Sequence, residues 1–215
     1  MLRYLIKTEI PNSICCMPEQ SMYHPYQPPR CFQNKYFNTI FTNLWRDAWL
    51  QTSYVRKRIE TPDQDFLDLD LASAGSNKAL LLVHGLEGDA YAPYVKGMVK
   101  AAKQAGWDAV SLNLRGCSGT INWQPNIYHS GRSEDLHNAI LHLLEQEAYQ
   151  YLAIIGFSLG GNLTLKYTGE RAERLDERIK AVTAVSVPFD LENVALNMDQ
   201  ISNVLFRYRF LTEVL

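Results

Sequence analysis

The chain has 215 residues, of which 47% are hydrophobic and 20% are charged, and its formal net charge is -2. This is the composition of an ordinary soluble globular protein that is large enough to bury one sizeable core. There is no basic excess that would indicate nucleic-acid binding, and no apolar run approaches the ~20 residues of a membrane span.

The N-terminal residues and the cysteines bear on the cellular location. Met1–Glu9 is interrupted by charge too early for the apolar region of a signal peptide. The four cysteines, at positions 15, 16, 31 and 117, show no metal-ligand spacing, and adjacent cysteines do not form a normal bridge with each other. We therefore expect a protein of the reducing cytoplasm. Separately, the chemistry expected of this chain calls for no metal and no organic cofactor.

The first fifty residues differ in character from the rest. Residues 1–30 are irregular and proline-rich toward their end, which predicts an extended arm. Aromatic side chains then recur every four positions over Phe37–Trp49, which favours a helix with one aromatic face. That face could contact an acyl chain or a membrane surface, but we favour packing against the main domain. The chain is accordingly divided into an N-terminal arm and aromatic helix, 1–50, and a core domain, 51–215.

Two strands joined by a turn are expected at the start of the core domain, between residues 54 and 71. The turn is predicted at Thr61–Asp65, which contains a Pro-Asp pair. The second strand alternates apolar and acidic residues from Leu67 onward, which predicts a strand near a sheet edge with one solvated face. By contrast, Ala79–Val83 is a continuous apolar run, typical of a strand buried on both faces of a parallel sheet.

Amphipathic helices alternate with further apolar strands through the rest of the chain. The expected elements are a helix around Tyr94–Ala102 that stops at Gly106, a strand at Ala109–Leu114, a helix from Ser133 as N-cap through Glu147, a strand at Tyr151–Ile155, a helix over 159–174, a strand at Ile179–Val187 and helical structure from Leu191. This alternation predicts an α/β fold, a mostly parallel sheet with helices on both faces.

The strand before residue 156 runs directly into Gly156–Gly160, which matches the pattern G-x-S-x-G. A serine at such a strand-to-helix turn has a strained backbone and an exposed hydroxyl, and its flanking glycines are small because the backbone doubles back over them. The following helix directs N–H groups toward a centre where negative charge develops. Ser158 is therefore a candidate nucleophile, with a solvent-facing serine at a helix start as the alternative.

Two other glycine-marked loops also follow predicted strands, namely His84–Leu86 and Arg115–Cys117. In parallel sheets, ligands bind at the carboxyl ends of the strands. The two loops and the serine turn are therefore expected to meet at one edge of the sheet and to form a single site there.

Six ordered motifs carry a resemblance to a known family. They are Thr61–Asp70, His84–Gly88, Arg115–Gly119, Tyr128–Gly131, Gly156–Asn162 and Ser186–Leu191. Together they resemble the YheT-like branch of the α/β-hydrolases, the group that includes the ABHD1/ABHD3-type proteins. The resemblance implies an α/β-hydrolase fold and a serine carboxylic ester hydrolase that forms an acyl-enzyme. A small-molecule ester or an acyl-lipid is implied as its substrate.

By position in the family pattern, Ser158 is the implied nucleophile, and the backbone N–H groups of Leu86 and Leu159 form the implied oxyanion hole. Two donors are needed because the ester oxygen gains nearly a full negative charge. His84 and Gly85 belong to the loop that supports this site. We expect His84 to order that loop through hydrogen bonds to the backbone.

The general base is missing from its usual place. The family's triad runs in the order Ser, acid, His, but all five histidines, at positions 24, 84, 129, 137 and 142, precede Ser158. His129 lies in a loop at the expected edge and is a candidate substitute, although we favour a role for its loop in shaping the pocket wall. Asp190 is a candidate acid, against the simpler interpretation of a helix-start aspartate.

Two further residues near this edge have alternative interpretations. Arg115 could hold an anionic group, but we favour an internal salt bridge to an acid such as Glu87 or Asp135. Cys117 could be a rival nucleophile, but no activating partner is visible in the sequence.

The resemblance stops before the part of the relatives that carries the triad acid and histidine. We therefore expect a truncated hydrolase, the N-terminal portion of a longer one. Its activity would be impaired, because a serine without its base is a poor nucleophile. A non-catalytic remnant or binding module is the alternative. We also expect an unpaired apolar sheet edge at Val182–Val187, which favours self-association.

Overall fold

The computed structural model describes residues 27–34, 37, 50–200, 203–204 and 207–208. The arm and the aromatic helix predicted from the sequence lie almost wholly outside these described residues. The described N-terminal part includes a short 3-10 helix, η2 (Arg30–Gln33). The division of the chain at residue 50 stays a prediction.

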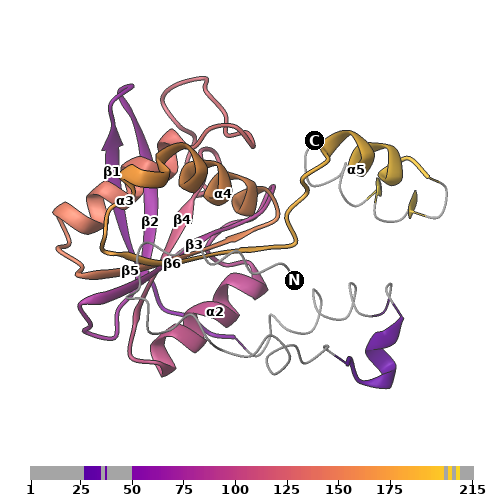
Figure 1. The fold of residues 1–215 in the computed structure, drawn as a ribbon, viewed down its shortest axis with the longest axis horizontal. Coiled ribbons are helices and arrows are strands. Elements are labelled where there is room, and N and C mark those ends of the chain that lie inside the picture. The colour runs from indigo at the N-terminus through magenta and orange to yellow at the C-terminus, as the bar shows by residue number, and fades with distance from the viewer. Residues whose placement is uncertain (1–26, 35–36, 38–49, 201–202, 205–206, 209–215) are drawn as a thin grey trace.

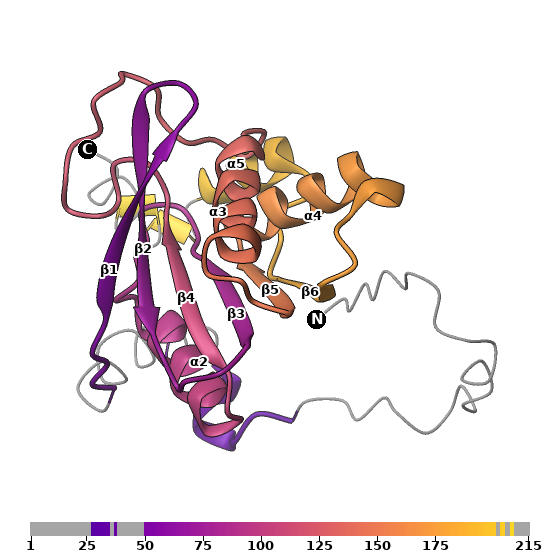
Figure 2. The same cartoon turned by 90° about the vertical axis from the view of Figure 1, so that its left-hand side faces the viewer.

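The described strands form one sheet, in the order β1-β2-β4-β3-β5-β6, and Figure 2 shows its twist. Their bounds are β1 (Val55–Thr61), β2 (Asp65–Ala72), β3 (Lys78–Val83), β4 (Asp108–Asn113), β5 (Tyr151–Phe157) and β6 (Ile179–Val185). β4, β3, β5 and β6 run parallel, whereas β2 is antiparallel to both of its neighbours, β1 and β4. The mostly parallel sheet predicted from the sequence is confirmed.

Helices cover both faces of the sheet, as Figure 1 shows. Their bounds are α2 (Pro93–Gln104), α3 (Glu134–Glu145), α4 (Leu159–Arg171) and α5 (Leu191–Met198), with a 3-10 helix, η4 (Ala172–Arg174), directly after α4. α2 packs on one face, and α3 and α4 pack on the other. None of the helices in the described part of the chain is long and apolar enough to span a membrane.

Strand β3 contributes to both layers of the core. Ala79, Leu81 and Val83 belong to the apolar cluster that includes α3 and α4. Leu80 and Leu82 belong to the cluster that includes α2. Because successive side chains of a strand point to opposite faces, a strand covered on both sides needs an unbroken apolar run. That is the basis on which the sequence predicts a buried strand here, and the prediction is confirmed.

The predicted solvated face of β2 is wrong. Asp68 and Asp70 are each 1% exposed. Arg58 and Arg56 lie directly opposite them on β1 and form two-pronged ion pairs with N···O distances of 2.7 to 2.8 Å. Opposite charges at facing positions of an antiparallel pair stabilise one another. The two arginines therefore cover the acidic face that the alternation alone assigned to water.

The ends of α2 and the start of α3 illustrate how the sequence sets helix boundaries. Pro93 is the first residue of α2, where its missing N–H costs nothing, and Gly106 follows the helix with φ 73°. Ser133 directly precedes α3 as predicted, but its side chain makes no capping hydrogen bond. The Ser133 hydroxyl instead donates to Glu170 of α4 at 2.6 Å, so it joins two helices rather than capping one.

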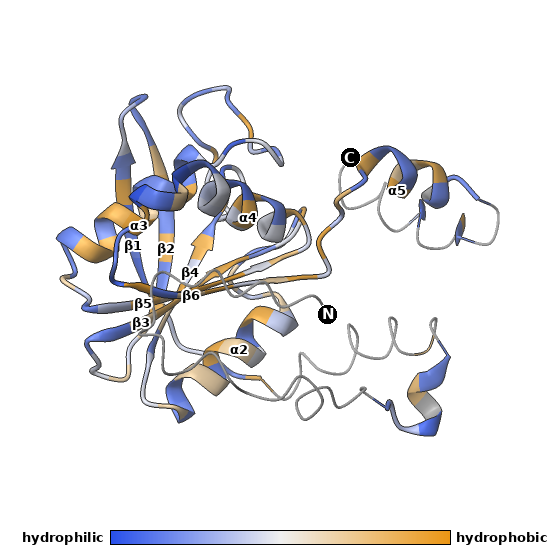
Figure 3. Cartoon of the chain, viewed as in Figure 1, coloured by the Kyte–Doolittle hydropathy of each residue, from blue (hydrophilic) through white to orange (hydrophobic). Residues whose placement is uncertain are grey.

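Among the described strands, β6 lies at one edge of the sheet, and the chain continues from it to α5, which stands to the side of the sheet in Figure 1. Asp190 begins α5 by accepting the Asn193 N–H at 2.9 Å, which is the simpler of its two predicted roles. α5 contains hydrophobic residues among polar ones (Figure 3), and its Leu191 and Leu196 side chains are exposed.

Candidate active site

Ser158 lies at the sharp turn between β5 and α4. Its backbone has φ 50° and ψ -116°, a conformation that residues with a side chain rarely adopt. Two main-chain hydrogen bonds hold Ser158 in this conformation. Its N–H donates to Val185 O at 2.9 Å, and its carbonyl oxygen accepts the Asn162 N–H at 3.1 Å. The residue itself is exposed. The backbone therefore presents the hydroxyl at the carboxyl edge of the sheet.

Two glycines make this turn possible. A Cβ on Gly156 would lie 2.3 Å from Gly160 O, and a Cβ on Gly160 would lie 2.3 Å from His84 O. Both distances are far shorter than real atoms allow, and the obstructing atoms belong to the backbone. The first turn of α4 thus packs against the ends of β5 and β3 with no room for a side chain.

The loop after β3 passes directly beside Ser158. A Cβ on Gly85 would lie 3.2 Å from the Ser158 Cβ. The loop folds into a turn in which the Gly88 N–H donates to Gly85 O at 3.1 Å. The structure therefore brings this loop and the serine turn together. The third predicted loop follows β4, which runs parallel to β3, and so leaves the sheet at the same edge.

Most N–H groups of this loop are already engaged. The Gly85 N–H donates to the Tyr94 hydroxyl at 3.0 Å, and the Glu87 N–H donates to the Tyr128 hydroxyl at 2.9 Å. For the Leu86 N–H, no hydrogen bond joins it to any residue that the structure describes. Leu86 itself is 38% exposed. Its N–H is therefore a free donor within the turn Gly85–Gly88.

Leu159 supplies a second free donor. It is the first residue of α4, and the first N–H groups of a helix have no partner within it. No described residue accepts a hydrogen bond from the Leu159 N–H. Free N–H groups therefore belong to the loop beside Ser158 and to the residue directly after it. Such donors stabilise the negative oxygen that forms when a serine attacks an acyl carbon.

His84 is buried and its ring is fixed by the main chain. Its Nε2 accepts the Leu114 N–H at 3.0 Å, so the proton resides on Nδ1, which donates to Gly85 O at 2.7 Å. Burial lowers the pKa of His84 and keeps the imidazole neutral. With both nitrogens in use, His84 ties the loop to the end of β4 and does not act as a base.

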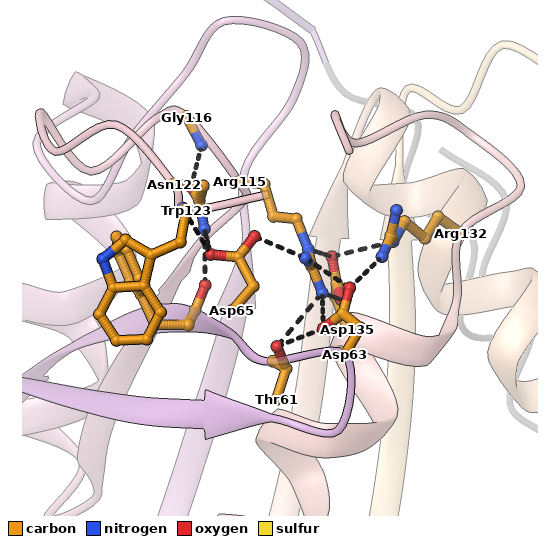
Figure 4. A network of polar contacts seen from close by, with 10 residues as sticks. Thr61, Asp63, Asp65, Arg115, Gly116, Asn122, Trp123, Arg132 and Asp135 are labelled. Carbon is orange, nitrogen blue, oxygen red and sulfur yellow. Dashed lines mark hydrogen bonds and ion pairs between the residues drawn. The ribbon is translucent and has the colours of Figure 1, made fainter. Parts of the chain in front are cut away.

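Arg115 is at the centre of the buried polar network in Figure 4. It is 3% exposed and pairs with Asp63 at 2.8 Å, Asp65 at 2.7 Å and Asp135 at 2.8 Å. Burial opposes the charge, but hydrogen bonds to Asp135 and Asp63 raise the pKa of Arg115 above its ordinary value. Of the two acids expected from the sequence, Asp135 is a partner and Glu87 is not. The guanidinium is engaged internally rather than presented to an anionic ligand.

The same network fixes the loop between β4 and α3 on the β1–β2 hairpin (Figure 4), and Figure 2 shows the loop and hairpin close together. Asp65 accepts hydrogen bonds from the Asn122 side chain at 3.0 Å and the Trp123 N–H at 2.9 Å. Burial opposes ionisation, but these bonds lower the pKa of Asp65. Arg132 donates to Asp63 at 3.1 Å, and hydrogen bonds from Arg115 lower the pKa of Asp63.

His129 and Cys117 are the remaining candidates from the sequence. His129 is exposed, its Nδ1 accepts the Gly131 N–H at 3.2 Å, and no described hydrogen bond links it to Ser158. Burial raises the pKa of the Cys117 thiol to about 11, so the thiol stays protonated at neutral pH. A protonated thiol is a poor nucleophile, which argues against Cys117 in that role.

Two tyrosines beside the loop were not assigned a role from the sequence. From the sequence, Tyr94 belongs to a predicted amphipathic helix, and Tyr128 begins the family motif Tyr128–Gly131. Their hydroxyl groups take up the N–H groups of Gly85 and Glu87. The Tyr94 ring also packs on Phe157, with ring centroids 4.8 Å apart. A tyrosine among aliphatic positions of a predicted helix face is the signal that could have indicated a polar partner.

A mostly parallel sheet covered by helices on both faces, with an exposed serine at a strained strand-to-helix turn, is typical of one class of protein, and comparison with known families identifies the same class. Residues 78–209 match the family described as alpha/beta hydrolase fold. The chain therefore belongs to the α/β-hydrolase fold family. Within it, the relatives are those of the YheT-like branch.

Three curated relatives illustrate that branch. The protein named "Putative esterase YheT" of Escherichia coli is 37% identical over 186 residues, which is 84% of this chain and 54% of that protein. Monoacylglycerol lipase of Saccharomyces cerevisiae is 30% identical over 60% of this chain and 28% of that protein. Phospholipase ABHD3 of Bos taurus is 26% identical over 74% of this chain and 41% of that protein. The chain thus spans about half the length of these relatives or less.

Solved structures share the fold at low sequence identity. The Pyrococcus furiosus esterase Pf2001 aligns with a TM-score of 0.59 and 21% identity, over 77% of this chain and 64% of that chain. The α/β serine hydrolase XC6422 of Xanthomonas campestris aligns with a TM-score of 0.52 and 17% identity, over 65% of this chain and 64% of that chain. These likenesses concern the fold alone.

Proposed function

We propose that the protein is a carboxylic ester hydrolase that forms an acyl-enzyme through Ser158. The observation that carries the proposal is the geometry of the turn. Ser158 is exposed at φ 50°, and Gly85 of the neighbouring loop is close beside it. The free N–H groups of Leu86 and Leu159 serve as the oxyanion hole. Family membership and relatives named esterase, lipase and phospholipase support hydrolysis in general terms.

In the proposed reaction, Ser158 Oγ attacks the carbonyl carbon of an ester and gives its proton to a general base. The carbonyl oxygen becomes an oxyanion and accepts hydrogen bonds from the N–H groups of Leu86 and Leu159. When the intermediate collapses, the alkoxide leaves with that proton and the acyl group stays on Ser158. Water then attacks the acyl-enzyme with the help of the same base, and the carboxylic acid is released. Each donor is worth about 10²–10³ in rate.

The lack of a described general base beside Ser158 limits the activity expected of this chain. All five histidines precede Ser158, and none of the described ones is hydrogen-bonded to it. Loss of the base alone costs about 10⁶ in kcat. We therefore propose that the residues present give slow acylation at most. The substrate class is a small-molecule ester or an acyl-lipid, no nucleic acid is involved, and the location is cytoplasmic.

A fluorophosphonate probe tests the role of Ser158, because it phosphonylates activated serines. We expect slow labelling of the folded protein, located by mass spectrometry on the peptide that contains Ser158 and lost in Ser158→Ala. Ser186→Ala is the matched control, because Ser186 is also an exposed serine with positive φ, at 55°, and lies after the neighbouring strand. Labelling that persists in Ser158→Ala, or disappears in Ser186→Ala, would contradict the assignment.

The second candidate function is a non-catalytic binding module that keeps the site but turns nothing over. The observation that favours it is the lack of any described base in contact with the Ser158 hydroxyl. This candidate predicts that a folded sample is not labelled at all, even at high probe concentration and long times. The same experiment therefore decides between the two.

A further inference from the structure

The loop that carries Leu86 is held by a residue with no assigned role. We propose that Tyr128 is a positioning residue for the candidate oxyanion hole: its hydroxyl clamps Glu87 and so leaves the adjacent Leu86 N–H as the free donor beside Ser158. This inference rests on the proposed function and names a residue through which that site acquires its shape.

The clamp consists of two hydrogen bonds to one residue. The Tyr128 hydroxyl accepts the Glu87 N–H at 2.9 Å and donates to Glu87 Oε1 at 2.7 Å. A single hydroxyl therefore engages both the main chain and the side chain of Glu87. With both groups held, the peptide unit that joins Leu86 to Glu87 has a fixed orientation.

Glu87 needs such support because of its backbone. Its φ is 52°, in the left-handed region that residues with a Cβ adopt only when their surroundings hold them there. The turn Gly85–Gly88 closes around this residue through its own hydrogen bond. Without the Tyr128 hydroxyl, the Glu87 N–H would lose its only described partner and the loop could relax to a less strained form.

Tyr128 is itself anchored independently of the loop that it holds. Its ring packs against the main apolar cluster, as does Cys117. Its segment, between β4 and α3, is fixed near both ends by the Arg115 network, through Asn122 on one side and Arg132 on the other. The clamp thus joins the candidate oxyanion loop to a segment that the Arg115 network holds in place.

The protonation state suits the clamp. Burial raises the pKa of Tyr128 above its ordinary value, so the hydroxyl keeps its proton at neutral pH and can donate to the Glu87 carboxylate. The Tyr94 hydroxyl accepts from Gly85 on the other side of the loop. The Gly88 N–H is bonded within the turn, so only the Leu86 N–H of residues 85–88 has no described acceptor.

The first test needs no chemistry. In Tyr128→Phe we expect the amide at position 87 to exchange with solvent deuterium about tenfold faster or more, while the slowest amides of β3 are unchanged. Tyr151→Phe is the control, because Tyr151 is an exposed tyrosine at the opposite end of β5 with no described hydroxyl hydrogen bond. Glu87→Gln keeps an acceptor for the hydroxyl and should retain the protection. Unchanged exchange in Tyr128→Phe would overturn the proposal.

The second test measures fluorophosphonate labelling of Ser158 as a function of probe concentration. A positioning role predicts that Tyr128→Phe lowers the maximal labelling rate about tenfold and leaves the half-saturating concentration unchanged, because the donor acts on the transition state. A change in half-saturation alone, or no change, would overturn the proposal. If the wild-type protein is not labelled, the proposed function fails, and the exchange rates alone decide whether Tyr128 clamps the loop.

Discussion

At the scale of single residues, His84 has the most constrained chemistry near Ser158. Both ring nitrogens bond to main-chain groups, and the residue is 1% exposed. A charged imidazole would have protons on both nitrogens, and the bond from the Leu114 N–H would be lost. Folding therefore requires the neutral form of this histidine, and protonation must oppose folding.

This requirement predicts a pH dependence of stability. In the unfolded chain the histidine pKa is about 6.5, and burial lowers the pKa of His84 in the folded protein, so the unfolded state binds more protons below about pH 6.5. The stabilising contribution is complete above that pH and is lost as pH falls, with a slope of up to about 1.36 kcal/mol per pH unit. We expect His84→Asn to unfold more easily at about pH 8 and to lose stability less steeply toward about pH 5.

Urea unfolding across this pH range measures the effect. His129→Asn is the control, because His129 is exposed. The stability curve of this variant should run parallel to that of the wild-type protein. His137 and His142 also have lowered pKa values through burial, but they are present in every variant and cancel in the comparison. A His84→Asn curve that runs parallel to the wild-type curve would contradict the prediction.

The sequence predicts the backbone conformation of single residues where a motif fixes it. The pattern around Ser158 identifies a strained turn and two glycines that steric overlap explains directly. It did not identify the partners of Arg115 on the β1–β2 hairpin, or the hydroxyl bonds of Tyr94 and Tyr128. Such contacts join segments far apart in the chain, and a local sequence pattern does not predict which distant group completes a hydrogen bond.

At the scale of elements, the first turn of α4 lies directly against the end of β3. A Cβ on Gly160 would lie 2.3 Å from His84 O and 2.4 Å from Val83 O. Because both obstructing atoms belong to the backbone, the helix would have to move as a unit. Any side chain here would separate Ser158 from the loop that contains Leu86.

We therefore expect Gly160→Ala to destabilise the fold by about 1–3 kcal/mol or more, despite the better helix propensity of alanine. Gly169→Ala in the same helix is the control, since nothing lies within 4 Å of its Cβ position, and there alanine should stabilise by up to about 1 kcal/mol. Urea midpoints at unchanged m-values measure both effects. Equal effects of the two substitutions would refute the steric explanation.

Elements were predictable from the sequence where one periodicity dominates. The apolar run of β3 and the helical spacing of α2 gave their type and approximate bounds. The solvated face that the sequence predicts for β2 is wrong, because Arg56 and Arg58 on the edge strand cover acidic residues that alternation alone assigns to water. The Ser133 hydroxyl does not cap α3 as the sequence predicts, because it donates instead to Glu170 on α4.

At the scale of the whole molecule, self-association is expected at the sheet edge formed by β6 and at the exposed apolar residues that follow it. Within the described residues no strand pairs with the outer side of β6. Phe189 and Leu191, which follow it, are 69% and 51% exposed. Unprotected edges of this kind promote pairing with another chain.

We expect the protein to self-associate with increasing concentration, as measured by sedimentation velocity. Thr183→Lys places a charge on β6 at a partly exposed position and should reduce the associated fraction. Thr120→Lys adds the same charge to an exposed loop elsewhere and should leave association unchanged. A wild-type protein that stays monomeric at all concentrations would contradict the expectation.

The Arg115 network also has a consequence for how the chain folds. Asp65 precedes Arg115 by 50 residues, and Asp135 follows it by 20. The pair with Asp65 can close only after β2 and β4 have met, and we expect it to form after the rate-limiting step of folding, because such non-local contacts carry the entropy cost of closing a long loop. Removing Arg115 should then leave the refolding rate nearly unchanged and speed unfolding. The buried guanidinium would thus determine how long the native state persists, rather than how quickly it is reached.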